Sequence, residues 1–241
     1  MRSDLSAFLC FFVLINWGFS QVEKQPDITI PKIIYSPNES YVELYNKAWE
    51  LALDHIKYEE GMPQSPYIDE AFWDHTIWIW DTEFMMLFYK HAQTPFSSIK
   101  SLNNFYHPIH KGVEMPLRIE ILDNPPFFAW IEYEYFKFSN DQKHLNQLLN
   151  TDQYLQKHFH WFDTVSKGTV MVNSVPTCIE KENNGYTWEG GRSGMDNTPR
   201  GRRGKNAVGH RPNHPDMLWI DAIAQQGLAA LYTAKLLSNG I

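Results

Sequence analysis

The chain has 241 residues, of which 43% are hydrophobic and 20% are charged, and its formal net charge is −7. This length is enough for one large domain or two small ones, and the hydrophobic content allows a sizeable core. The mildly acidic balance excludes a general attraction to nucleic-acid phosphates. Aromatic residues reach 15%, and such side chains both fill cores and cover the C–H faces of sugar rings.

The first 20 residues predict a secretory signal peptide. Arg2 supplies the positive end, and an apolar run over 7–19 follows that is too short to span a bilayer. Gly18 and Ser20 are small residues placed for cleavage before Gln21. We therefore expect a secreted or periplasmic protein with no membrane attachment after cleavage. A retained anchor is the alternative, which the short run disfavours.

Cysteine and histidine usage argues against a metal site or another cofactor. Cys10 lies in the signal, so the mature chain would keep only Cys178, which can form neither an intramolecular disulfide nor a thiolate cluster. The spacing of His210, His214 and Asp216 fits no common zinc signature. We interpret these three residues as capping or positioning groups and expect no cofactor.

The chain then reads as helices separated by long loops. Residues 21–40 are polar and form a lead-in segment, and Asn38 or Ser40 is suited to cap a helix over 41–58. A loop over 61–74 precedes an aromatic segment over 78–92, where Asp81 or Thr82 is suited to begin a helix. A short helix is expected over 96–106.

Proline and asparagine mark the later helices. Asn124-Pro125-Pro126 is typical of a helix start, with the helix running through Phe138. Ser139 or Asn140 would cap a helix over 141–163, and a last helix is expected over 216–237 after Pro215. Residues 170–175 give the best strand signal, which is short. The fold class is therefore mainly α.

The segment over 186–202 has a composition that no amphipathic helix or strand requires. It reads Y-T-W-E-G-G-R-S-G-M-D-N-T-P-R-G-R, with four glycines around Asp196. Glycine and proline forbid a regular element through its middle. A solvated surface loop would explain the arginines but not Trp188 or the glycine pattern. We favour a functional loop, because such loops on rigid scaffolds commonly carry chemistry.

Four segments together resemble glycoside hydrolase family 63 and the related trehalases. Ile79-Trp80-Asp81-Thr82-Glu83-Phe84 resembles their Trp-Asp-x-x-Phe segment. Ser193-Gly194-Met195-Asp196-Asn197-Thr198-Pro199-Arg200 resembles the loop that carries their general acid. Asp123-Asn124-Pro125-Pro126 is similar to their Gln-Pro-Pro helix start, and Asn213-His214-Pro215-Asp216-Met217-Leu218 to a later one. The matches fall in family order and cover about 63–237.

The resemblance implies an (α/α)6 toroid, in which six helical hairpins surround a funnel-shaped pocket. It also implies inverting hydrolysis of an α-linked glucoside or mannoside, with an oligosaccharide or small α-glycoside as substrate. Carried over by position, Asp196 is the general acid. The substrate-binding residues would be Trp80, Asp81, Phe84, Asn124, Trp188, Arg192 and Arg200. Arg192 departs from the Glu that trehalases have there, so their contacts at that position do not transfer.

Inverting hydrolysis requires two carboxyl groups on opposite faces of the sugar. The acid must stay protonated, which burial favours, whereas Arg192 and Arg200 would favour the anion at Asp196. We therefore expect their guanidinium groups to bind substrate hydroxyls or backbone carbonyls. The family's general base is a Glu from later hairpins, and no position here matches it. We expect residues 41–241 to be the N-terminal half of the catalytic domain, and therefore a fragment that alone is inactive.

Two other classes of function remain open. One is a non-catalytic carbohydrate-binding fragment or pseudoenzyme that uses the same cleft without a base. The other is an α/α-toroid polysaccharide lyase, which would need Tyr or His bases facing a uronic acid. The loop around Asp196 is not typical of such lyases.

Overall fold

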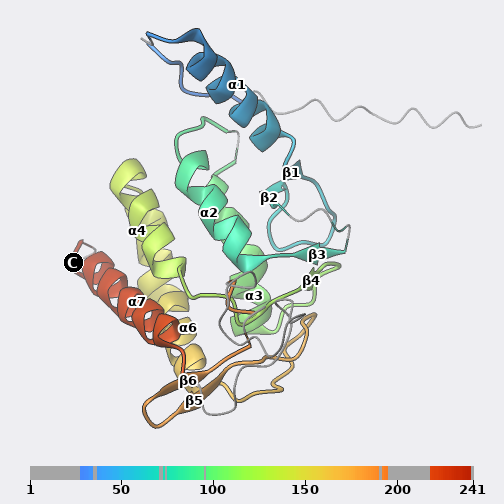
Figure 1. The fold of residues 1–241 in the computed structure, drawn as a ribbon, viewed down its shortest axis with the longest axis vertical. Coiled ribbons are helices and arrows are strands. Elements are labelled where there is room, and N and C mark those ends of the chain that lie inside the picture. Colours follow the sequence, from blue (N-terminus) through green and yellow to red (C-terminus); the bar gives the residue numbers. More distant parts are fainter. Residues whose placement is uncertain are drawn as a thin grey trace, which may run out of the picture.

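The computed structural model describes residues 28–34, 37–70, 73, 75–94, 96–189, 192–194 and 218–239. Within these ranges the protein is mainly helical, as the sequence predicts (Figure 1). The predicted signal peptide lies outside the described residues. None of the helices in the described ranges combines the length and apolar character needed to cross a bilayer.

The helices are α1 Glu39–Leu53, α2 Ile79–Tyr89, the 3-10 helix η1 Ser98–Leu102, α3 Asn103–Lys111, α4 Phe128–Ser139, α5 Gln142–Asn146, the π-helix η2 Gln147–Thr151, α6 Tyr154–Thr164 and α7 Ile220–Asn239. The strands are β1 Ile56–Lys57, β2 Tyr67–Ile68, β3 Thr76–Ile77, β4 Arg118–Ile119, β5 Glu180–Glu182 and β6 Gly185–Thr187. Every strand is short, so the described strands only join the helices and do not form a layer.

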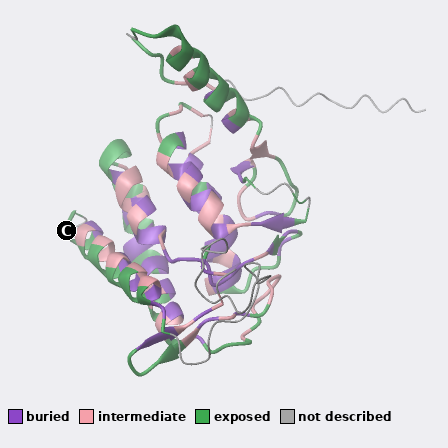
Figure 2. Cartoon of the chain, in the orientation of Figure 1, coloured by how far each residue is buried: buried purple, intermediate pink, exposed green. Residues whose placement is uncertain are grey.

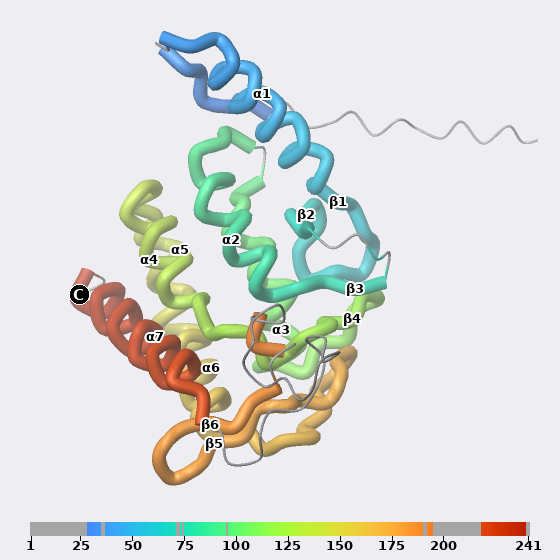
Figure 3. Tube along the Cα trace, viewed as in Figure 1, coloured from blue at the N-terminus to red at the C-terminus, as the bar shows by residue number. Residues whose placement is uncertain are grey.

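Three helices, α2, α4 and α7, run parallel and start at the same end of the molecule (Figures 1 and 3). Helix α4 lies between the other two and packs against both. Helix α1 runs opposite to α2, and α6 packs on α3 and α7. The segments that lead into α2 and α4, and residues 218–219 before α7, therefore lie at one end.

A parallel ladder aligns the segments that lead into α2 and α4. Strand β3 pairs with β4, with Thr76 opposite Arg118 and Ile77 opposite Ile119. The backbone N–H of Glu120 then donates to Ile77 O over 3.1 Å. Strand β3 leads straight into α2, and residues 120–127 join β4 to α4, so this ladder aligns the two segments that approach the helix starts.

Helix starts test the sequence predictions directly. The cap of α1 is confirmed, because the Asn38 side chain accepts a hydrogen bond from Ser40 N over 3.0 Å. The expected cap of α2 was placed too late. This helix begins at Ile79 after Trp78, which makes no side-chain cap. Strand β3 runs straight into the helix and leaves no room for a separate capping turn.

The predicted start of α4 at Asn124 is wrong. The helix begins at Phe128, and its N-cap residue Phe127 has no side-chain cap. The backbone N–H groups of Phe127 and Phe128 instead face the buried carboxyl of Glu83 from α2. A carboxyl group at a helix N-terminus is favourable because its oxygens meet the unpaired N–H groups there.

The segment over 141–163 forms three helices and not one. Asp141 caps α5 by accepting from His144 N over 2.9 Å, in place of the expected Ser139 or Asn140. The π-helix η2 follows, and Gln153, at φ 56°, ends the run before α6 begins. A left-handed residue cannot continue a right-handed helix.

The remaining expectations are partly wrong. The strand predicted over 170–175 does not form; only Ser174 makes an isolated bridge, to Ile119. A hairpin of β5 and β6 forms instead. The last helix runs over Ile220–Asn239, two residues beyond the expected end, and its predicted start lies outside the described residues.

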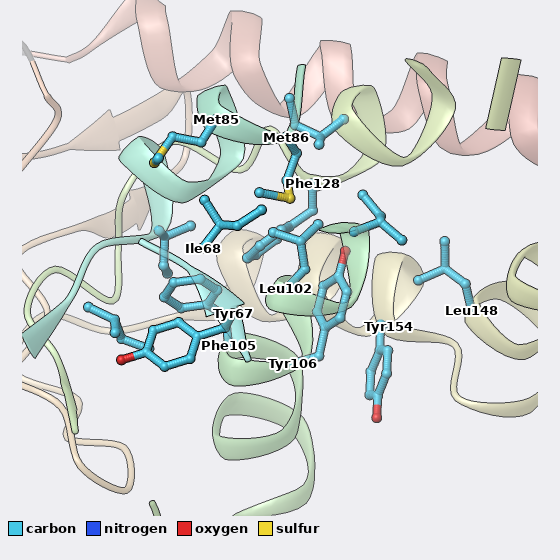
Figure 4. Packing of buried hydrophobic residues seen from close by; sticks show 14 of the residues in the cluster. Tyr67, Ile68, Met85, Met86, Leu102, Phe105, Tyr106, Phe128, Leu148 and Tyr154 are labelled. Atoms are coloured by element: carbon cyan, nitrogen blue, oxygen red, sulfur yellow. The ribbon is translucent and has the colours of Figure 1, made fainter. Parts of the chain in front are cut away.

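The hydrophobic core has two parts. The larger part unites α2, α3, α4 and α6 through residues such as Met86, Leu102 and Phe128 (Figure 4). The smaller part, at the base of α7, contains Phe162, Trp188 and Trp219. Figure 2 shows that α1 and much of α7 are exposed. Large apolar side chains are exposed there, namely Tyr41, Leu44 and Leu51 on α1 and Ile220, Ile223, Leu231 and Leu237 on α7.

The buried His158 and the partly buried His110 lie side by side against the larger core. The rings of His110 and His158 lie 5.4 Å apart, and His158 stacks on Trp161. Burial lowers the pKa of His110 to about 4 and that of His158 well below its ordinary value. Both rings are therefore neutral near pH 7.

These histidines predict a loss of stability in acid. The unfolded chain binds protons below its histidine pKa of about 6.5, whereas the folded chain excludes them until about pH 4 at His110. Stability is thus fully present above about pH 6.5 and is lost as the pH falls. From His110 alone, the free energy of unfolding in urea should drop by about 2 kcal/mol between pH 7 and pH 5. In His110→Gln this contribution to the pH dependence should be lost, whereas the exposed control His160→Gln should keep it. The same dependence of the free energy of unfolding on pH in wild type and both variants would contradict the assignment.

Candidate functional site

The Asn124 side chain joins the three described segments that sequence analysis selected. Its Oδ1 accepts from the backbone N–H of Trp80, 3.4 Å away, in the first turn of α2. Its Nδ2 donates to the backbone carbonyl of Arg192 over 3.1 Å. Asn124 is 3% exposed, so both contacts are shielded from water. One amide thus holds the start of α2, the approach to α4 and the loop over 192–194 together.

Gly194 lies directly against the Trp80 ring. A Cβ atom placed on Gly194 would lie 1.6 Å from Cζ3 and 1.9 Å from Cε3 of Trp80. The glycine also has φ +72°, a left-handed conformation that side chains rarely adopt. Position 194 therefore requires glycine for two independent reasons. The loop is seated on the indole through its backbone.

Arg192 and its neighbours fix this loop from the other side. The guanidinium of Arg192 donates from Nη1 to the carbonyl of Glu120 over 3.1 Å. The N–H groups of Arg192 and Ser193 both donate to Glu189 O. Of the two groups that sequence analysis allowed for this arginine, the carbonyl is the one that the described structure provides.

Asp123 carries a buried carboxyl behind the same loop. Its Oδ2 accepts from the backbone N–H of Cys178 over 2.7 Å. Burial raises the pKa of Asp123, while that hydrogen bond and the nearby Arg192 charge oppose the rise. This carboxyl ties the loop before β5 to the segment that leads into α4, and so positions Asn124.

An aromatic cluster extends from this junction along α2 and α4. Trp80, Phe84, Phe127 and Trp130 are all partly exposed, with neighbouring ring centroids 5.5–6.2 Å apart. Sequence analysis selected Trp80 and Phe84 but gave Phe127 and Trp130 no role beyond helix packing. Their spacing of three residues on α4 places them on one helix face, which is the signal that could have found them.

Asp81 adds an acidic group one residue after Trp80. It is partly buried, and burial, followed by the charge of Glu70, raises its pKa to about 6. The carboxyl therefore changes charge close to neutral pH. An aromatic surface beside such a carboxyl can stack on an apolar face of a ligand and accept hydrogen bonds from its hydroxyl groups.

Trp188 lies in the core and not on the aromatic cluster. It is 2% exposed, and its ring packs 5.9 Å from Phe162 and 6.2 Å from Trp219. The bulk of its indole supports the base of α7. It offers no open face to a ligand in the described structure.

Asp196 and Arg200 lie outside the described residues, as do His210, His214 and Asp216. Within the described ranges, no three His, Cys, Asp or Glu side chains are grouped as a metal site requires.

No family model, characterised protein or solved structure gives a match to this chain. The functional interpretation therefore depends on the residues and their arrangement.

Gly194→Ala tests the contact with Trp80. The new methyl group would collide with the indole and strain the backbone, so the loop should leave its seat. Gly112→Ala is the matched control, because Gly112 also has positive φ, +64°, but nothing within 4 Å of the added Cβ. The control should cost about 1–2 kcal/mol of stability from backbone strain alone. Gly194→Ala should cost more in urea unfolding and change the near-ultraviolet circular dichroism of tryptophan. Identical effects of the two substitutions would show that the contact is absent.

Proposed function

We propose that this protein is an inverting glycoside hydrolase acting on an α-linked glucoside or mannoside. The observation that carries the proposal is the convergence of Trp80, Asn124 and Gly194 at one end of the helical layer. These residues belong to three sequence segments that resemble family 63 and trehalase motifs. Asn124 is 44 residues from Trp80 and 68 residues from Arg192 in the chain, so its two contacts join distant segments.

The helical arrangement supports a toroid of hairpins as the architecture of the catalytic domain. Parallel α2, α4 and α7 would form part of its inner wall, and α1, α3 and α6 part of its outer wall. The loop ends of the inner helices would then face the pocket. Exposed apolar residues on α1 and α7 are consistent with further helical contacts at both edges.

Sugar binding would use the aromatic cluster and Asp81. Partly exposed Trp80 and Phe84 offer ring faces for the C–H groups of a pyranose. The Asp81 carboxylate would accept hydrogen bonds from its hydroxyl groups, which fixes the orientation of the sugar. Asn124 is committed to two backbone contacts and would position Trp80 without touching the substrate.

Bond cleavage would depend on Asp196. In this proposal its carboxyl donates a proton to the glycosidic oxygen as the bond from that oxygen to the anomeric carbon breaks. Water attacks the anomeric carbon from the opposite face and gives its proton to a carboxylate base, so the configuration inverts. No residue is assigned as that base.

Sugar binding by the chain should depend on Asp81 and on pH. Binding of methyl α-glucoside or methyl α-mannoside, followed by tryptophan fluorescence, should weaken as the pH falls through about 6, because Asp81 becomes protonated there. Asp81→Asn should bind more weakly at pH 7 and lose this pH dependence. Trp73→Phe, at an exposed tryptophan, is the control and should bind like wild type. If sugar binding by wild type does not change with pH, Asp81 is not part of the binding site.

Asp196→Asn should abolish hydrolysis of an unactivated α-glycoside by the active enzyme and leave substrate affinity nearly unchanged. Asn keeps the shape of the side chain but cannot donate the proton, and such assistance is worth about 10²–10⁴-fold. A nitrophenyl glycoside or a glycosyl fluoride has a better leaving group and should be affected much less. Equal losses on both kinds of substrate would make Asp196 a structural residue of its loop.

A further inference from the structure

A polar cavity lies apart from the aromatic cluster. It has a volume of ≈ 430 Å³ and is lined by residues from η1, α3, α5, η2 and the start of α6. This volume is sufficient for a small organic ligand. Trp80, Asn124 and Gly194 do not line it, so it is distinct from the site at the start of α2 and α4.

The apolar wall of this cavity is rigid. The rings of Tyr106 and Tyr154 stack with centroids 4.7 Å apart and an interplanar angle of 14°. Leu148 lies beside them, and the two hydroxyl groups point in opposite directions (Figure 4). Both tyrosines are buried at 1–3% exposure, so the wall exists before any ligand binds.

Most of the charged groups around the cavity are already paired. Lys111 Nζ lies 2.9 Å from Asp152 Oδ1, and His144 Nε2 lies 2.7 Å from Glu132 Oε2. Asp141 accepts the backbone N–H of His144 as the cap of α5. Asp152 and Glu132 therefore have ion-pair partners, whereas the partner of Asp141 is a backbone N–H.

Two lysines at the cavity form no ion pair in the part of the chain that the structure describes. Lys100 from η1 and Lys143 from α5 line the cavity, and neither forms an ion pair with any residue in the described ranges. Burial lowers the pKa of His144, but the charge and hydrogen bond of Glu132 raise it above its ordinary value, and the Lys100 charge opposes that rise. An anion in the cavity would give Lys100 and Lys143 an oppositely charged partner.

Neutral hydrogen-bonding groups complete the lining. Burial, then the charge of Lys111, lowers the pKa of His107, so its ring is neutral near pH 7 and can both donate and accept. Asn103 adds an amide group, and Gln147, whose Nε2 donates to Asp152 Oδ2 over 2.8 Å, adds an amide oxygen. An inorganic anion needs only donors, whereas this mixture also suits hydroxyl groups.

We propose that this cavity binds a small hydroxylated anion of the class of sugar acids and sugar phosphates, with Lys100 and Lys143 holding the anionic group and His107, Asn103 and Gln147 meeting the hydroxyls. The proposal is independent of the glycosidase activity proposed above. It concerns a separate cavity and a different chemical property of the ligand, its negative charge.

Calorimetric titration with D-glucuronate and with glucose 6-phosphate, at constant ionic strength, tests this proposal in the Asp81→Asn variant, where the proposed sugar site is weakened, and D-glucose serves as the neutral probe. We expect at least one anion to bind and D-glucose to bind at least about tenfold more weakly, since charged hydrogen bonds are the stronger ones. A preference for one anion would identify a carboxylate or a phosphate as the group that is recognised. Failure of both anions to bind would overturn the proposal, as would equal binding of D-glucose.

Matched variants locate the binding. Lys100→Gln with Lys143→Gln should weaken anion binding about tenfold or more, whereas Lys100→Arg with Lys143→Arg should retain it. Lys47→Gln with Lys167→Gln removes the same charge from exposed positions elsewhere and should have no effect. Asp81→Asn should leave anion binding unchanged, which separates this site from the proposed sugar site. An equal loss in the Lys47 and Lys167 control would show that only net charge matters.

Discussion

The contact between the Trp80 indole and the backbone of Gly194 joins segments that are distant in the chain. Packing this close is possible only where no Cβ intervenes. The backbone of the loop therefore rests directly on the flat apolar face of the indole. Asn124 locks the same junction through its two hydrogen bonds. The ladder of β3 and β4 sets the height at which these groups meet. The helices supply a rigid base, but the junction decides how the loops are placed on it.

Buried carboxyl groups form a second constraint at this end of the molecule. Glu83 is fully buried, and burial raises its pKa well above the ordinary value, while the amides of Phe127 and Phe128 oppose the rise. The charge of Asp81 also raises the pKa of Glu83. An acid of this kind stabilises the start of α4 from a neighbouring helix. The charge state of Asp81 is thus linked to that of Glu83.

Local signals in the sequence were the most reliable. The Asn38 cap forms as expected because both of its groups lie within three residues. Asn124 also looked like a cap, yet its amide is used across the fold, where it satisfies two backbone groups that no local pattern reveals. The break at Gln153 was missed for a related reason, since a non-glycine residue in the left-handed conformation leaves no compositional mark.

Part of the candidate site could be predicted from the sequence. Trp80 and Asp81 were selected because their motif is short and contiguous, but aromatic content alone could not separate a partly exposed ring from a core ring. Trp188 belongs to the core, whereas Phe127 and Trp130 join the exposed cluster. Whether an aromatic ring is buried or partly exposed depends on how the helices pack, and this cannot be predicted from a single sequence. The polar cavity beside α3 and α5 was missed altogether because its lysines come from separate elements.

Helix α1 is attached to the rest of the protein mainly through its last turns. Its buried residues are Trp49 and Ala52. Trp49 packs edge-on against Phe88 and Tyr89, and the Tyr89 hydroxyl donates to Ala52 O. The first turns have little apolar contact to hold them. Amide protons near the start of α1 should therefore exchange with solvent by local fraying, whereas those near its end should exchange only when the helix detaches as a unit.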